Sequence, residues 1–244
     1  MSLSRVNHDE LEAMPPAMAL STAMLILLAV IAGAFTAIIV LPVWLPGLST
    51  SLASTEPKAH WYLSRISGLV AYTLLWLSMA LGLGITSQLA RLWPGGPSAF
   101  DLHQFTSLLG LAFALFHALI LIGDSYVGYT LAQVLVPFAS TGYRPGWVGV
   151  GQIGFYLLAV VGLSFYVRQT IGHRAWRLIH SLSFVVFLLA LAHGLMSGSD
   201  SAAPWVRGLY WASLGSLLFL GSYRLLSPLV VRPRPPSPVM KDRA

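Results

Sequence analysis

The chain has 244 residues, of which 56% are hydrophobic and only 9% charged, against about 25% charged in typical soluble domains. Its formal net charge is +6 and it contains no cysteine. The composition excludes a water-soluble protein, and the missing cysteine excludes disulfides, cysteine-ligated iron–sulfur clusters, thioether-attached haem and thiol catalysis. The positive charge does not indicate a nucleic-acid partner, because the basic residues lie at the ends of apolar segments.

Long stretches without a charged residue predict transmembrane helices. Five exceed the ~20 residues that cross a bilayer; they lie between Glu12 and Glu56 and at 66–90, 102–123, 145–167 and 178–199. A sixth, shorter stretch lies between Arg207 and Arg224, whose long side chains can reach the headgroups. We therefore expect an all-α integral membrane protein, a bundle of six transmembrane helices. Their expected positions are about 18–45, 62–87, 101–123, 148–168, 175–197 and 205–227.

The distribution of Lys and Arg between alternate loops predicts the orientation. Ten of the 14 lie in the N-terminal segment, in the loops at 88–100 and 168–177, and in the C-terminal tail. By the positive-inside rule, both termini are expected in the cytoplasm and the chain in the cytoplasmic membrane, in contact with lipid. The expected domains are a cytoplasmic segment (1–17), the membrane domain (18–227) and a disordered, basic, Pro-rich cytoplasmic tail (228–244).

The longest connection, 124–147, is uncharged from Ser125 to Tyr143 and rich in Pro and Gly. It is too polar for a further span. We expect an interfacial segment on the outer side, with Leu131 to Phe138 lying against the membrane.

Four of the seven histidines lie inside expected spans, where an imidazole is costly and marks a functional site. His103 and His117 are 14 residues apart, which is ~21 Å of helical rise with an angular offset of about 40°. Gly110 lies midway and is expected to leave open space between the two rings. His180 and His193 are 13 residues apart, a rise of ~19.5 Å, on a helix expected to run in the same direction. We therefore expect His103 to face His180 near the cytoplasmic side and His117 to face His193 near the outer side.

Two facing neutral imidazoles in an apolar bundle are what a b-type haem needs, one nitrogen on each side of the iron. Two such levels, with both axial positions filled, favour electron transfer over chemistry at the metal. The haem propionates need cations near the membrane edges. We expect Arg65 at the outer haem and Arg174 or Arg177 at the inner haem, although a purely topological role is an equally open interpretation for each.

Two considerations leave alternatives open. Thirteen residues of ideal helix rotate a side chain by about 220°, so His193 aligns with His180 only if a kink, a 3₁₀ stretch or a tilt intervenes. The histidines could instead form interhelical hydrogen bonds, a proton relay or a cation pathway, although such pathways usually include carboxylates at membrane depth. The competing hypothesis is therefore a haem-free six-helix carrier or structural subunit.

Other polar and aromatic residues have simpler interpretations. We expect His60 and His173 at the surface, in boundary loops. Phe184, Phe187 and Trp76 either pack against porphyrins or form ordinary core.

Three sequence motifs occur together between residues 61 and 225. They are Arg65-Ile66-Ser67-Gly68, the stretch from His103 to His117 that contains Leu108-Leu109-Gly110, and Trp176-Arg177-Leu178-Ile179-His180 followed by His193. In this combination the chain resembles the ferric reductase-like transmembrane domain family. That family includes the membrane parts of NADPH oxidases and ferric reductases and the haem subunit of the bacterial methionine-sulfoxide-reductase system.

The resemblance implies two stacked b haems, the inner one on His103 and His180 and the outer one on His117 and His193, with electrons leaving the cytoplasm. The sequence has no glycine-rich dinucleotide loop. The implied donor is therefore a separate cytoplasmic flavoprotein or a quinol, and the acceptor lies on the outer side, where it could be a protein. The chain is expected to be the electron-transfer subunit of an oxidoreductase, without a flavin or NAD(P)H domain of its own.

Overall fold

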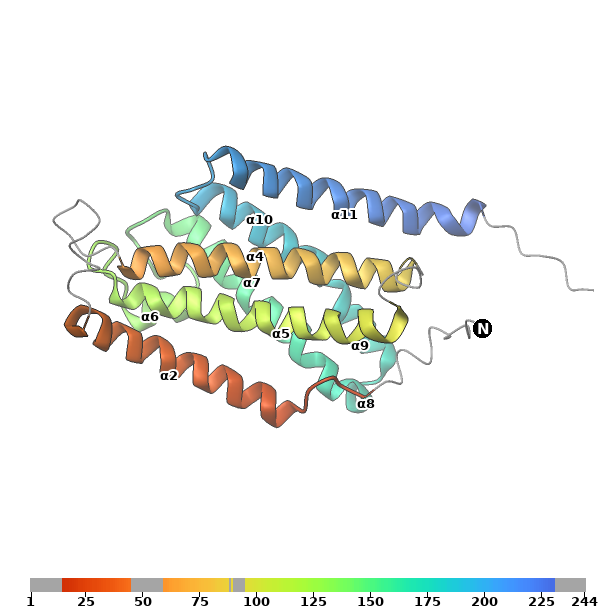
Figure 1. Ribbon diagram of the computed structural model, residues 1–244, viewed down its shortest axis with the longest axis horizontal. Helices are drawn as coiled ribbons and strands as arrows, with labels where there is room; N and C mark the ends of the chain where they lie inside the picture. Colours follow the sequence, from red (N-terminus) through yellow and green to blue (C-terminus); the bar gives the residue numbers. More distant parts are fainter. Residues whose placement is uncertain (1–14, 45–58, 88, 90–94, 231–244) are drawn as a thin grey trace, which may run out of the picture.

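The computed structural model describes residues 15–44, 59–87, 89 and 95–230 (Figure 1). This part of the chain is all-helical and contains no strand. Of the expected terminal segments, residues 1–14 and 231–244 lie outside the described part. The α-helices are α2 (Leu20–Trp44), α4 (Ala59–Thr86), α5 (Gly96–Ile120), α6 (Leu131–Leu135), α7 (Pro145–Ser164), α8 (Arg168–Ile171), α9 (His173–Ser181), α10 (Ser183–Ser197) and α11 (Pro204–Val230).

Proline and glycine mark several helix boundaries. Prolines lie in the first turns of α5 and α7, where the missing N–H group has no helical partner to lose. Gly172 separates α8 from α9 with φ of 83°, a left-handed conformation that favours glycine. A helix is present at each of the six predicted positions.

Five helical segments are long and apolar enough to cross a membrane. They are α2, α4, α5 with the 3₁₀ turn Leu121–Gly123, α7 continued through α8, and α9 together with α10. Among the described residues α11 is also long, at 27 residues, but it is not one of these five. The sixth crossing and the orientation of the termini therefore stay predictions.

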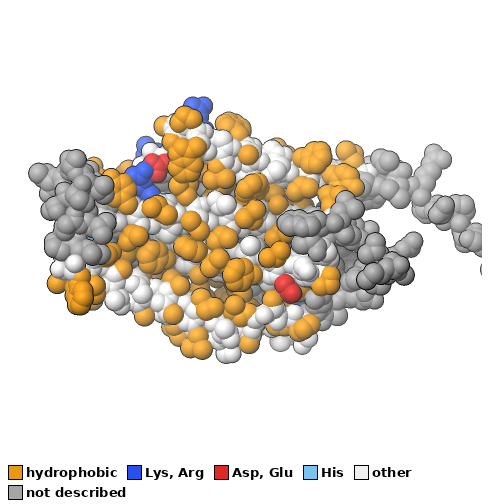
Figure 2. All heavy atoms as spheres, viewed as in Figure 1, with side chains coloured by type: hydrophobic (Ala, Val, Ile, Leu, Met, Phe, Trp, Pro, Cys, Tyr) orange, Lys and Arg blue, Asp and Glu red, His pale blue; other side chains and the backbone are white. Residues whose placement is uncertain are grey.

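The surface of the bundle exposes many large apolar side chains, more than a water-soluble protein would. Ile39 of α2 is 70% exposed and Leu225 of α11 is 75% exposed. Figure 2 shows hydrophobic side chains spread over the visible face, with few charged side chains between them. Lipid tails cover such a surface without a hydrophobic penalty, whereas water does not. The chain has the character of a multi-pass membrane protein.

The helices run roughly along the long axis of the molecule (Figure 1). The helix α6 lies at one end, which we name the α6 end, and α8 and α9 lie at the other, the α9 end. The helix α4 packs along α5, α2 packs on α5, and α11 packs on α4; α7 and α10 form a further contacting pair. Both histidine-bearing segments, α5 and α9–α10, thus belong to one bundle.

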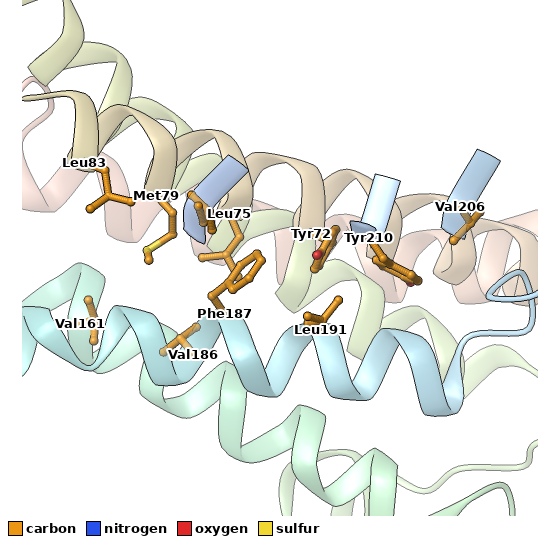
Figure 3. Packing of buried hydrophobic residues seen from close by; sticks show 11 residues of the cluster. Tyr72, Leu75, Met79, Leu83, Val161, Val186, Phe187, Leu191, Val206 and Tyr210 are labelled. Atoms are coloured by element: carbon orange, nitrogen blue, oxygen red, sulfur yellow. The ribbon is translucent and has the colours of Figure 1, made fainter. Parts of the chain in front are cut away.

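A hydrophobic core fills the middle of the bundle between α4, α10 and α11, with one residue from α7 (Figure 3). Tyr72 stacks on Phe187 at 5.9 Å between ring centroids and meets Tyr210 edge-on at 5.0 Å. Trp76 donates its indole N–H to the Ser216 hydroxyl at 2.9 Å, so Phe187 and Trp76 are core residues. Phe184 is 46% exposed and points out of the core.

Gly110 corrects an expectation. Its missing side chain was expected to leave space between two imidazoles. Gly110 instead lies where α5 approaches α4: an added Cβ would lie 3.4 Å from Leu74 Cβ and 3.7 Å from the Ala71 carbonyl oxygen. Its place between the histidines reflects close packing of two helices.

Substituting Gly110 tests this contact. Gly110→Ala fits in ordinary van der Waals contact, whereas Gly110→Leu should push α4 from α5 and destabilise the fold by about 1–3 kcal/mol. Thermal unfolding in detergent measures the difference. Gly33→Leu on α2 is the matched control, because no atom lies within 4 Å of an added Cβ there. Equal stability of Gly110→Leu and the control would contradict the close contact.

Candidate functional site: two facing histidine pairs

The structure brings together the four histidines of the expected spans as two pairs. His103 of α5 faces His180 of α9, with 5.9 Å between ring centroids and 74° between ring planes. His117 of α5 faces His193 of α10, with 6.2 Å between centroids and 77° between planes. The two pairs have nearly the same geometry at two levels of the bundle.

A break in the second histidine-bearing segment resolves the angular mismatch of the 13-residue spacing. The helix α9 ends at Ser181 and α10 begins at Ser183. Leu182 donates its N–H to the Ile179 carbonyl three residues back, at 3.0 Å, which is the bonding of a 3₁₀ turn. Because this turn interrupts the regular helix, His180 and His193 can each face a partner on α5.

Three of the four imidazoles are held by backbone carbonyls of a neighbouring helix. His103 Nδ1 lies 2.8 Å from the Ser78 carbonyl oxygen, and His117 Nδ1 lies 2.7 Å from that of Ser64. His193 Nδ1 lies 2.8 Å from the Trp147 carbonyl oxygen. A carbonyl oxygen only accepts, so Nδ1 must donate its hydrogen in each ring. In the neutral ring, Nε2 then keeps its lone pair and can bind a metal.

A glycine four residues later leaves each of these carbonyl groups accessible to the imidazole ring. In an α-helix the side chain of residue i+4 lies beside the carbonyl of residue i, and Gly68, Gly82 and Gly151 lie four residues after Ser64, Ser78 and Trp147. An added Cβ would lie 2.8 Å from His117 Nδ1 at Gly68, 3.3 Å from His103 Cε1 at Gly82, and 2.5 Å from His193 Nδ1 at Gly151. The three rings occupy the space that a side chain would fill.

The sequence contains a signal for two of these three glycines that the spacing of the histidines alone does not reveal. The pattern Ser-x-x-x-Gly occurs at Ser64–Gly68 and again at Ser78–Gly82. The two copies are 14 residues apart, the same spacing as His103 and His117, and α4 and α5 are antiparallel neighbours (Figure 1). Ser64 Oγ and Ser78 Oγ also lie 3.0 and 3.1 Å from the Nδ1 atoms of their histidines.

His180 has a different neighbourhood. Its ring lies 5.3 Å from Trp176, at 32° between planes. Trp176 in turn contacts Phe165, over which the buried Arg168 places its guanidinium at 3.7 Å. Arg174 and Arg177, the residues predicted at the inner haem, are both exposed on α9.

A cavity of about 250 Å³ adjoins the second pair. His117 and His193 line it, together with Gly68, Gly151 and mostly apolar side chains such as Phe155. Neither His103 nor His180 is among its lining residues. The space available beside the two pairs therefore differs.

The connection between α5 and α7 covers the α6 end of this cavity. Gln152 of α7 donates to the carbonyl oxygens of Gln133 and Val134 at 2.8 and 2.7 Å, which ties α6 to α7. Tyr129 also lines the cavity; its hydroxyl donates to the Tyr143 carbonyl oxygen at 3.3 Å, and burial raises the pKa of its phenol.

The same connection exposes large apolar side chains, among them Leu131, Leu135 and Phe138. This agrees in character with the expected interfacial segment. Its position against a membrane stays a prediction.

Arg65 lies at the edge of the cavity but is already paired. Its Nε donates to Asp200 Oδ2 at 2.7 Å and its Nη2 to Asp200 Oδ1, and its guanidinium lies 5.4 Å from the Tyr62 ring centroid. Asp200 lies in the turn between α10 and α11 and also lines the cavity. The sequence does not reveal Asp200 as a partner of Arg65, because pairing across 135 residues leaves no local pattern.

The two remaining described histidines with expected positions differ in outcome. His173 is exposed, as expected. The expectation for His60 was wrong: it lies in the first turn of α4, only 5% exposed, beside Gly123 and Ile38. Helix α4 begins three residues earlier than expected, which brings His60 under the α5–α6 connection.

No family model, curated protein or solved structure matches the chain. The described residues contain no group of three or more His, Asp or Glu side chains arranged to hold a metal ion.

Gly151→Ala tests the carbonyl anchoring of His193. The added methyl group would displace the ring and break the Nδ1–H bond to the Trp147 carbonyl. Histidine ¹⁵N chemical shifts of labelled protein report the tautomer and the hydrogen bond. Gly162→Ala on the same helix is the control, because no atom lies within 4 Å of an added Cβ. An unchanged His193 signal in Gly151→Ala would contradict the anchoring.

Proposed function

We propose that this chain is a membrane di-haem b-type cytochrome subunit that carries electrons across the cytoplasmic membrane. The observation that carries the proposal is the pair of facing histidines repeated at two levels, with Nδ1 donating to a helix carbonyl in three rings of the four.

The distance between facing rings fits a metal ion bound between them. With metal–nitrogen bonds of about 2 Å and a ring radius of about 1 Å, imidazoles on opposite sides of one ion have centroids about 6 Å apart. The observed values are 5.9 and 6.2 Å. The orienting hydrogen bonds are those expected of metal-binding histidines, because they fix the tautomer and aim Nε2 at the ligand.

The number of protein ligands favours haem over a free ion. Each level offers two imidazoles and, among the described residues, no third His, Asp or Glu. A structural zinc site needs four protein ligands, whereas iron in a porphyrin needs only two. His103 with His180, and His117 with His193, would each hold one b-type haem, and the haem would supply a one-electron carrier.

The residues of the chain hold the two sites at different depths. His103 and His117 are separated by ~21 Å of helical rise, most of the ~30 Å hydrocarbon core. Ser78 and Gly82 support the first level and Ser64 and Gly68 the second, so one rigid helix fixes the separation. The walls of the cavity beside the second pair are mostly apolar.

The direction of transfer rests on the charge distribution. Ten of the 14 Lys and Arg residues lie in the N-terminal segment, the loops at 88–100 and 168–177 and the C-terminal tail, which adjoin the helix termini at the α9 end, so the positive-inside rule predicts that this end faces the cytoplasm. We propose that His103 and His180 form the inner site and His117 and His193 the outer site. The described part is all-helical and has no βαβ unit for a nicotinamide cofactor. We therefore propose a separate flavoprotein or a quinol as donor, and an acceptor, such as a protein, on the outer side.

Counting haem per polypeptide tests the proposal. The purified chain should contain about two b haems; alanine at His117 or His193 should remove the outer one, and alanine at His103 or His180 the inner one. Pyridine haemochrome spectra give the count. His173→Ala, at an exposed histidine, should keep both. A colourless folded protein from haem-replete cells would instead support the haem-free carrier or structural subunit.

A further inference from the structure

Arg65 and Asp200 form an ion pair at the edge of the cavity beside His117 and His193, so Arg65 already binds a carboxylate there. Arg65 donates to both oxygens of Asp200, from Nε and from Nη2. The side chains are 30% and 25% exposed, so solvent screens the pair only in part. A guanidinium that binds a carboxylate through two nitrogens is in the geometry that suits any carboxylate ligand.

The pair is linked to the outer histidines from both sides. Arg65 directly follows Ser64, whose carbonyl holds His117. Asp200 lies seven residues after His193, and its backbone carbonyl accepts from Ala203 N–H at 2.8 Å in the turn before α11. Movement of the Asp200 side chain therefore need not break this turn, because the turn is held by backbone atoms.

The charged side chains that line the cavity determine what an anionic ligand would contact there. Among the described residues that line the cavity, Arg65 and Asp200 are the only Lys, Arg, Asp or Glu. Together they are neutral. Arg144 and Arg207 lie at the same end, but neither lines the cavity, and Arg144 donates to the Met196 carbonyl. An anionic group entering the cavity meets one cation there, and Asp200 already holds it.

We propose that Asp200 competes with a haem propionate for the Arg65 guanidinium and so lowers the affinity of the outer site for haem. This inference rests on the proposed function. Exchanging one carboxylate for another at the same guanidinium conserves the number of charge-assisted hydrogen bonds. Haem binding then has one remaining unfavourable contribution: the Asp200 carboxylate loses its partner and stays in solvent beside an anionic cofactor.

The substitution Asp200→Asn removes the competing charge and keeps the shape of the side chain. It should tighten haem binding at the outer site about 2- to 5-fold, the range expected for a partly exposed ion pair. Arg65→Gln should weaken binding. Asp200→Glu keeps a carboxylate and should bind like the parent.

The decisive comparison uses two porphyrins. Haem has two ionised propionates, whereas haem dimethyl ester has none. The full chain with His103→Ala, which leaves one proposed site, is prepared without haem in nanodiscs and titrated with each porphyrin through the Soret band. Asp200→Asn should tighten haem binding and leave ester binding unchanged. Asp101→Asn, an exposed carboxylate near the start of α5, is the matched control and should change neither.

Three results would overturn the competition. Weaker haem binding in Asp200→Asn would mean that Asp200 supports Arg65. Unchanged binding would mean that the two carboxylates do not compete, and an equal gain for the ester would mean that charge on the propionates is not involved. If the parent binds neither porphyrin, the proposed function itself fails, and the competition fails with it.

Discussion

The hydrogen bond from an imidazole Nδ1–H to the carbonyl of a neighbouring helix is the interaction on which the rest of the site depends. Hydrocarbon supplies no water, so a polar ring between helices must find a partner within the protein. The carbonyl oxygens that accept from His103, His117 and His193 are accessible to the rings because the residue four positions later in each helix is glycine. Each such bond contributes only about 0.5–1.5 kcal/mol, but it fixes which ring nitrogen carries the hydrogen.

The hydrogen bond at Nδ1 fixes the tautomer of the imidazole and so determines which ring nitrogen can bind a metal. With Nδ1 committed to a carbonyl, the lone pair of Nε2 is left for a metal. At the second level the facing ring, His193, is held in the same way, whereas at the first level the facing ring, His180, lies against Trp176. The second level repeats the first because α4 and α5 present Ser-x-x-x-Gly and His at the same 14-residue interval. One helix pair therefore sets both the orientation of the rings and the distance between the levels.

Much of this arrangement could be predicted from the sequence, because the relevant signals are periodic. Charge-free stretches locate the helices, and the 14- and 13-residue spacings predict which histidines face each other. Other features depend on tertiary contacts. The 3₁₀ turn at Leu182 has no proline or glycine to mark it, Asp200 pairs with Arg65 across 135 residues, and Gly110 lies midway between two histidines although it packs against Leu74. His60 was misplaced because an error of three residues at a helix start decides whether a side chain is buried.

Electron paramagnetic resonance of the oxidised protein tests the central claim most directly, because it reports the axial ligands of each iron. Facing rings at 74° and 77° are nearly perpendicular. We expect two low-spin ferric signals of large g anisotropy, which are typical of bis-imidazole haem with perpendicular ligand planes. Absence of any low-spin haem signal, or a dominant high-spin signal from iron with a vacant axial position, would contradict it.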